Sequence, residues 1–254
     1  MVIFLATKRH LPAPKTKENA KTNISAEEIR ENAKEIKQRI YALLAVFGVV
    51  IFFWFSFHQN GLTLTMFAKD YTLLGGIFNS AEIFQSINPF LVVFLTPLII
   101  TIFGRMAKKG KEPSTPKKIA IGMGIAALAF VIMAVGSIGL PLLSDVTAQG
   151  GLPDTARVTP WLLFATYSIL TVAELFISPL GLSFVSKVAP PHMQGLMQGG
   201  WLTATAVGNF SLVLGAMMYE NISISITWTV FITVCLASML VMLGMVKWLE
   251  RIAK

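Results

Sequence analysis

The residue with the clearest potential for chemistry is Glu174, in the middle of a long apolar stretch from about Pro160 to Val185. It is the only acidic residue placed so deep in such a stretch. If the stretch crosses a membrane, a bare carboxylate there costs a few kcal/mol or more, so it must be protonated, paired or facing a hydrated cavity. Each state suits a proton or substrate site. The alternative is a structural carboxylate bonded to a neighbouring helix.

Further polar side chains could share such a site. Ser178 follows Glu174 by four residues and therefore shares its helical face, and Pro179 frees a backbone carbonyl nearby. In an earlier apolar stretch, Gln85 and Asn88 lie one turn apart and face the same direction. Amides so placed either hydrogen-bond a polar ligand or tie helices together, and both interpretations stay open.

A histidine follows the first strongly aromatic run of the chain. His58 comes directly after the segment Phe52 to Phe57 and is followed by Gln59 and Asn60. A histidine that titrates near neutrality can bind or relay a proton. Because His58 lies beyond the midpoint of its apolar stretch, it could equally be a polar cap at the membrane interface.

Glycines surround one tryptophan near the end of the chain, Trp201. Small residues at four-residue spacing usually indicate close helix packing. Trp201 itself is either an anchor at the membrane interface or the wall of a pocket. The glycines are Gly195, Gly199, Gly200 and Gly208.

These side chains must be positioned by membrane-spanning helices. The chain is 54% hydrophobic and only 13% charged, which is far from the balance of a soluble domain. Its apolar stretches are long enough to cross a hydrocarbon core of roughly 30 Å. We therefore predict an all-α membrane protein, a six-transmembrane-helix bundle. The expected spans are about 40–67, 82–103, 119–143, 160–185, 199–218 and 224–248.

The segment before the first predicted span reads as a linker. Met1 to Thr7 is apolar but short and precedes its cationic residues, so it is typical of the end of a preceding transmembrane helix rather than a signal peptide. Residues 8–39 are expected to form a cytoplasmic linker. Within it, Ser25 and Glu28 make a capping box that opens a charged surface helix running to about Arg39.

The distribution of lysine and arginine predicts the orientation. Of 21 such residues, only Lys69 and Arg157 fall on one side of the predicted spans. The positive-inside rule therefore places both termini in the cytoplasm, with the protein in the plasma (cell inner) membrane. The basic residues of this chain, whose net charge is +8, lie mostly beside apolar segments, so no nucleic acid partner is expected.

No pattern in the sequence indicates an enzyme. Gly122, Gly124 and Ala127 imitate a dinucleotide-binding fingerprint, but they lie inside a long apolar stretch with no preceding strand. The single cysteine, Cys235, has no disulfide or metal-ligand neighbour and is expected to serve packing. We expect no cofactor and no metal.

Four motifs together resemble the proton-dependent oligopeptide transporter family of the major facilitator superfamily, and the basic loop K-E-P-S-T-P-K-K at Lys111 to Lys118 is also similar. Their order and spacing correspond to the seventh, eighth, tenth and eleventh helices of a twelve-helix transporter. The resemblance thus implies a C-terminal half, helices 7 to 12. The motifs are F-W-F-S-F-H-Q-N-G-L-T-L-T-M-F-A at 53–68, F-Q-S-I-N-P at 84–89, E-L-F-I-S-P-L-G-L-S at 174–183 and G-L-M-Q-G-G-W-L-T-A-T-A-V-G-N at 195–209.

The resemblance implies roles for several residues in a proton-coupled di- or tripeptide symporter. Glu174 would receive the amino terminus of the peptide, with Asn88 and Ser178 lining the same end of the site. Trp54 and Trp201 would wall side-chain pockets. The missing N-terminal six-helix half would supply the lysine that faces Glu174, as well as the proton-coupling acidic motif.

One position departs from the family pattern. His58 stands where the family often has a glutamate paired to a first-helix arginine. A charged histidine cannot make that ion pair, so the resemblance implies a departure from the usual extracellular gate and from its coupling to protons. Two alternatives stay open: a half-transporter for another small solute such as nitrate, and a truncated membrane fragment that transports nothing.

Overall fold

The computed structural model describes residues 26–253, and these residues are almost entirely helical. Six helical segments are long and apolar enough to cross a membrane, which confirms the predicted all-α fold class. The predictions for Met1 to Thr7, for the linker up to residue 25 and for the Ser25 cap lie outside the described residues.

The helical elements follow one another with short connections. They are α2 (Ala26–Phe57), η2 (His58–Gly61), α3 (Thr63–Tyr71), α4 (Ile83–Lys108), α5 (Thr115–Gly136), α6 (Leu143–Ala148), η3 (Asp154–Ala156), α7 (Pro160–Val188), η4 (Pro191–Met193), α8 (Gln194–Phe210), α9 (Leu212–Asn221) and α10 (Ile224–Ile252).

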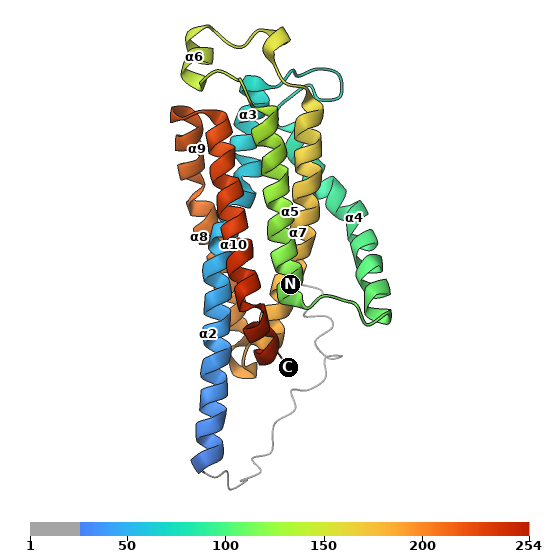
Figure 1. Cartoon of the computed structure of the whole chain (residues 1–254), viewed down its shortest axis with the longest axis vertical. Helices are drawn as coiled ribbons and strands as arrows, with labels where there is room; N and C mark the ends of the chain where they lie inside the picture. The colour runs from blue at the N-terminus through green and yellow to red at the C-terminus, as the bar shows by residue number, and fades with distance from the viewer. Residues whose placement is uncertain (1–25, 254) are drawn as a thin grey trace, which may run out of the picture. The chain divides into compact units, whose positions relative to one another are not determined.

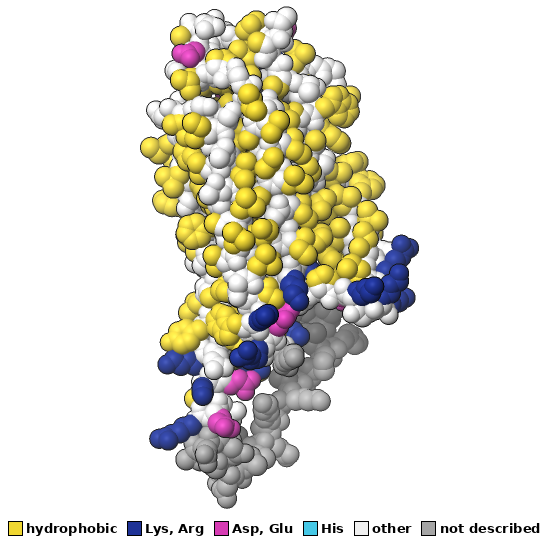
Figure 2. Space-filling view, viewed as in Figure 1, with side chains coloured by type: hydrophobic (Ala, Val, Ile, Leu, Met, Phe, Trp, Pro, Cys, Tyr) yellow, Lys and Arg dark blue, Asp and Glu magenta, His cyan; other side chains and the backbone are white. Residues whose placement is uncertain are grey.

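The chain divides into two compact units, Met1–Ile36 and Lys37–Lys254. Of the first unit, the described residues form the start of α2. The second unit holds the bundle, in which α5 packs between α7 and α10 and α4 packs on α7 (Figure 1). On the face shown in Figure 2, the lysines and arginines gather at one end of the bundle, and hydrophobic side chains cover its middle.

The first span differs from its predicted bounds of 40–67. No helix end occurs near residue 39, because α2 runs without interruption from Ala26 to Phe57. Glutamate, lysine and arginine are good helix formers, so the charged segment continues directly into the apolar one. The whole span reaches Tyr71, with its helix interrupted by the 3-10 turn His58–Gly61.

Two other spans differ from the predicted bounds by more than five residues at one end. The third was expected to reach residue 143, but α5 ends at Gly136, and Gly139 then takes a left-handed φ of 82° ahead of Pro141. Such a glycine and a following proline end helices. The fifth span covers Pro191–Asn221 and is divided at Ser211 between α8 and α9.

Close helix packing explains the glycines that imitate a dinucleotide fingerprint. A Cβ added at Gly122 would lie 2.8 Å from Ile177 Cγ1 on α7, and one at Gly124 would lie 2.8 Å from Met239 Sδ on α10. These two glycines therefore let α5 approach both of its neighbours. Cys235 on α10 is completely buried, in accordance with a packing role.

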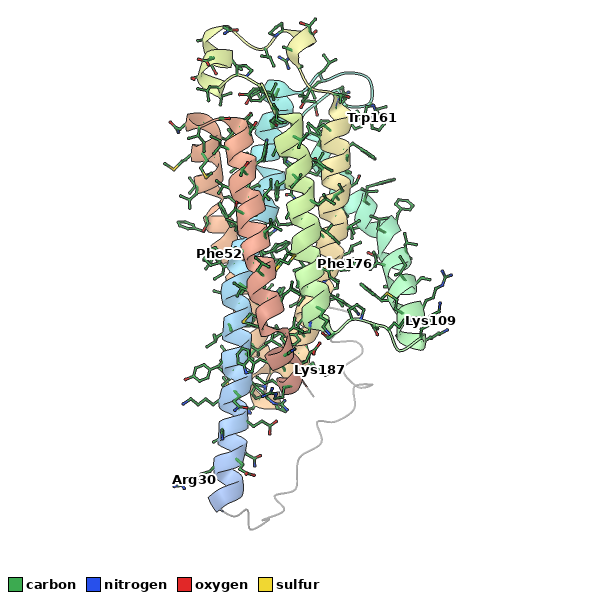
Figure 3. All side chains as sticks on the ribbon, in the orientation of Figure 1. Arg30, Phe52, Lys109, Trp161, Phe176 and Lys187 are labelled. Carbon is green, nitrogen blue, oxygen red and sulfur yellow. The ribbon has the colours of Figure 1, made fainter. Side chains whose placement is uncertain are left out.

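A buried lysine holds the basic end of the bundle together. Lys118, on the first turns of α5, is 5% exposed, and its Nζ bonds to Glu112 Oε1. The same Nζ lies 4.1 Å from the centroid of the Phe103 ring on α4. Phe103 in turn meets Phe176 of α7, which Figure 3 labels, edge to face at 5.1 Å between ring centroids. Lys118 thus links α4, α5 and the loop between them.

We expect Glu112→Gln to lower the free energy of unfolding by about 2 kcal/mol, because it leaves the buried Lys118 ammonium without its anion. The partial exposure of Glu112 keeps the loss below that of a fully buried pair. The matched double variant Glu112→Gln/Lys118→Met removes both charges at similar volume and should recover most of the loss. Thermal unfolding in detergent measures both, and equal losses would contradict the argument.

Candidate functional site

The structure joins Glu174 to Asn88, although 86 residues separate them in the chain. Glu174 lies half-buried on α7, and Asn88 Nδ2 on α4 donates to Glu174 Oε2 at 2.8 Å. No lysine, arginine or histidine among residues 26–253 forms an ion pair with Glu174. The carboxylate is therefore held by an amide and has no counter-charge in the part of the chain that is described.

Thr171 belongs to the same cluster and was missed by the sequence analysis. Asn88 Nδ2 also donates to Thr171 Oγ1 at 3.2 Å, and Thr171 Oγ1 donates to the backbone oxygen of Tyr167 at 2.8 Å. Thr171 is completely buried. Its position three residues before Glu174, on the same helical face, is the signal that could have identified it.

Gln85 and Asn88 both tie helices together. Gln85 Nε2 donates to Thr65 Oγ1 at 2.9 Å and to the backbone oxygen of Gly61 at 3.3 Å. One turn later, Asn88 reaches α7. The two amides thus connect α4 to the interrupted first span on one side and to the helix of Glu174 on the other.

His58 lies at the start of the 3-10 turn that interrupts the first span. Its ring is half-buried and stacks on Trp54 at 4.7 Å between centroids. The turn is also contacted from α7, since the Tyr167 hydroxyl donates to the backbone oxygen of Asn60 at 2.5 Å. Within the described residues no hydrogen bond or ion pair joins His58 to Glu174.

Ser178 lies half-buried one turn beyond Glu174 on α7, and its hydroxyl makes no hydrogen bond with any residue in the described range. The helix continues through Pro179, so this proline does not end it. Ser178 is therefore near the carboxylate along the helix but is not part of the hydrogen-bonded cluster of Glu174, Asn88 and Thr171.

The two tryptophans assigned to pocket walls are packed inside the bundle in this structure. Trp201 on α8 is 2% exposed and lies over Gly181 of α7, where an added Cβ would be 2.0 Å from the indole ring. Trp54 is 4% exposed and lies beside Gly208 of α8. An anchor residue has its ring at the membrane surface, so the anchor interpretation of Trp201 is wrong. A role in side-chain pockets stays a prediction.

Comparisons with known proteins point to one family. A family model described as PTR2, POT family, matches residues 5–234. The peptide transporter YePEPT of Yersinia enterocolitica is 30% identical over 181 residues, covering 70% of this chain and 34% of that protein. Dipeptide and tripeptide permease B of Salmonella typhimurium is 29% identical over 230 residues, covering 85% and 44%.

Solved structures show the same fold. A crystal structure of a peptide transporter POT in complex with sulfate matches with a TM-score of 0.73 at 24% identity, covering 99% of this chain and 44% of that one. A POT family transporter in complex with 5-aminolevulinic acid matches with a TM-score of 0.71 at 20% identity, covering 98% and 45%. The chain thus spans less than half the length of each of these relatives.

Proposed function

The chain belongs to the POT family, and we propose that it is the C-terminal six-helix half of a proton-coupled di- or tripeptide symporter, supplying the carboxylate side of the peptide site. It is a multi-pass integral membrane protein of a transporter family. The observation that carries the proposal is the half-buried Glu174 carboxylate, held by Asn88 and without a cation among the described residues.

A zwitterionic peptide explains this arrangement. Its ammonium group needs an anion at membrane depth and its carboxylate needs a cation, because an unpaired charge there is costly. Asn88 donates a hydrogen bond to Glu174 Oε2 and so fixes the orientation of the carboxylate. The other oxygen, Oε1, accepts no hydrogen bond from the residues that the structure describes. This oxygen is the proposed acceptor for the peptide ammonium, with Ser178 lining the same end of the site.

Transport would then follow from a change of partner at Glu174. In the empty site, a lysine of the N-terminal half neutralises Glu174, and a peptide ammonium replaces that lysine when substrate binds. Protonation of Glu174 removes its attraction for either cation and so couples the proton to release. Rocking of the two halves around a midplane site is the architecture expected of such transporters.

The membrane orientation supports the same scheme. The last turns of α4 and α7 carry basic residues at the same end of the bundle. These residues are Arg105, Lys108 and the adjoining Lys109 on α4, and Lys187 on α7; Figure 3 labels Lys109 and Lys187. By the positive-inside rule this end faces the cytoplasm of the plasma membrane, with both termini on that side. The interrupted first span with His58 then acts as the outer gate, where stacking on Trp54 replaces an ion pair to the partner half.

Uptake in the presence of competitors tests the cargo. The chain is expressed with its N-terminal partner half in bacteria without their own peptide permeases, and uptake of labelled dialanine is measured. We expect an excess of other dipeptides to compete, nitrate to have no effect, and a protonophore to abolish uptake. Competition by nitrate would favour the alternative small-anion cargo. If the assembled halves take up neither solute, the chain is a fragment without transport activity.

A further inference from the structure

A groove between α2 and α10 plays no part in the proposed peptide site. Its volume is about 460 Å³, and Figure 1 shows the two helices side by side. Each helix contributes residues at positions i, i+3, i+4 and i+7, which form one continuous stripe on its surface. The lining residues are Ala45, Gly48, Val49 and Phe52 on α2, and Val234, Ala237, Ser238 and Val241 on α10.

The lining is almost entirely hydrocarbon, with small residues at its centre. A Cβ added at Gly48 would meet no atom within 4 Å, so the middle of the groove is open. Phe52 and Val241 are more than half exposed and form its outer walls (Figure 3 labels Phe52). Ser238 is only 5% exposed, and its hydroxyl makes no hydrogen bond with any described residue. One hydroxyl cannot orient a polar molecule, so the groove fits a hydrocarbon chain.

The stripe on each helix leads to an aromatic residue and a cation at the basic end of the bundle. Along α2 the positions before Ala45 on this face are Tyr41, 55% exposed, and Lys37, whose Nζ lies 5.6 Å from the Tyr41 ring centroid. Along α10, the positions after Val241 lead to Trp248 and Arg251. Aromatic and basic residues so placed are typical of sites for lipid headgroups.

The two helices bring these ends to one level. They are antiparallel, and Phe55 of α2 meets Phe231 of α10 at 5.6 Å between ring centroids. Phe55 and Lys37 are 18 residues apart, and 18 residues beyond Phe231 is Leu249, so Lys37 lies level with Leu249, two residues before the exposed Arg251. Lys37 and Arg251, which continue the two lining stripes, thereby lie at the same end of the apolar groove.

The distance from Lys37 to the middle of the groove fits one leaflet of a bilayer. Lys37 and Gly48 are separated by about 16 Å along α2, at 1.5 Å per residue. Half of a hydrocarbon core of roughly 30 Å is about 15 Å. We propose that an anionic phospholipid of this leaflet binds here, with one acyl chain in the groove and its phosphate at Lys37 and Arg251. Charge complementarity favours it over a neutral lipid or a protein helix.

Native mass spectrometry of the purified chain tests the site. The chain is mixed in detergent with phosphatidylglycerol or phosphatidylcholine of the same acyl chains, and retained lipid is counted. We expect preferential retention of phosphatidylglycerol. Gly48→Leu fills the groove and should weaken retention about tenfold, because roughly two buried methylene groups are displaced at about 0.8 kcal/mol each. The double variant Lys37→Gln/Arg251→Gln should remove the preference while leaving phosphatidylcholine retention unchanged.

The matched control is Gly104→Leu on α4, where an added Cβ also meets no atom within 4 Å. It should retain phosphatidylglycerol as the unchanged chain does. If Gly48→Leu does not give a folded protein, Ala237→Val fills the opposite wall and should show the same loss. Equal retention of the two lipids by the unchanged chain, or equal effects of the groove-filling and control variants, would overturn the proposal.

Discussion

Replacing Glu174 by glutamine is expected to abolish proton-driven dipeptide uptake by the assembled transporter. The substitution removes the only anion proposed to receive the peptide ammonium. Loss of one partner of a buried charge pair costs about 2–5 kcal/mol, so uptake should fall at least about thirtyfold. The measurement is initial uptake of labelled dialanine by the chain and its partner half, normalised to the amount of protein in the membrane.

The Glu174→Gln variant also distinguishes a substrate-binding role of Glu174 from a structural role. Asn88 Nδ2 donates to a single oxygen of Glu174, and the amide oxygen of glutamine can accept the same hydrogen bond. The contact between α4 and α7 should therefore survive, with little change in thermal stability. Thr171→Val is a useful companion, since it removes one bond of Asn88 but keeps the charge and should reduce uptake only modestly. Undiminished uptake by Glu174→Gln would refute the assigned role.

The sequence could identify the polar residues but not how they pair. Hydropathy shows that Glu174 and Asn88 lie within spans, because each interrupts an apolar stretch. Their contact depends on how α4 and α7 are rotated about their axes, and the near-uniform apolarity of these helices gives no face that would reveal it. The resemblance to a family implies that both residues lie at one end of a site. Composition and spacing alone could not predict that they lie together.

The same limit applies to tryptophan. The hydropathy of a tryptophan is the same whether its ring faces lipid or another helix. The sequence therefore allows Trp201 to be either an interfacial anchor or the wall of a pocket. What decides its burial is Gly181, which lies twenty residues earlier and on another helix.

The charged segment before residue 40 gives no signal of a helix end, because its residues are good helix formers. The helix α2 therefore runs through this segment.

Gly181→Val is expected to cause the largest loss of stability among the glycine substitutions. A Cβ at this position would lie 2.0 Å and 2.3 Å from two carbons of the Trp201 ring. The ring cannot move away easily, because Trp201 is 2% exposed and meets Phe47 of α2 edge to face. Overpacking of this severity should cost about 3 kcal/mol, at the upper end of the usual range. Thermal unfolding in detergent measures the loss.

A second substitution makes this prediction specific to the contact. Trp201→Leu removes the ring that the new side chain would strike, so Gly181→Val/Trp201→Leu should be more stable than the sum of the single variants predicts. Gly199→Val on α8 is the control, because an added Cβ there meets no atom within 4 Å. If Gly181→Val and Gly199→Val lose equal stability, α7 and α8 do not meet through Trp201 and Gly181. The helix that carries Glu174 would then be positioned by its contacts with α4, α5 and the 3-10 turn His58–Gly61.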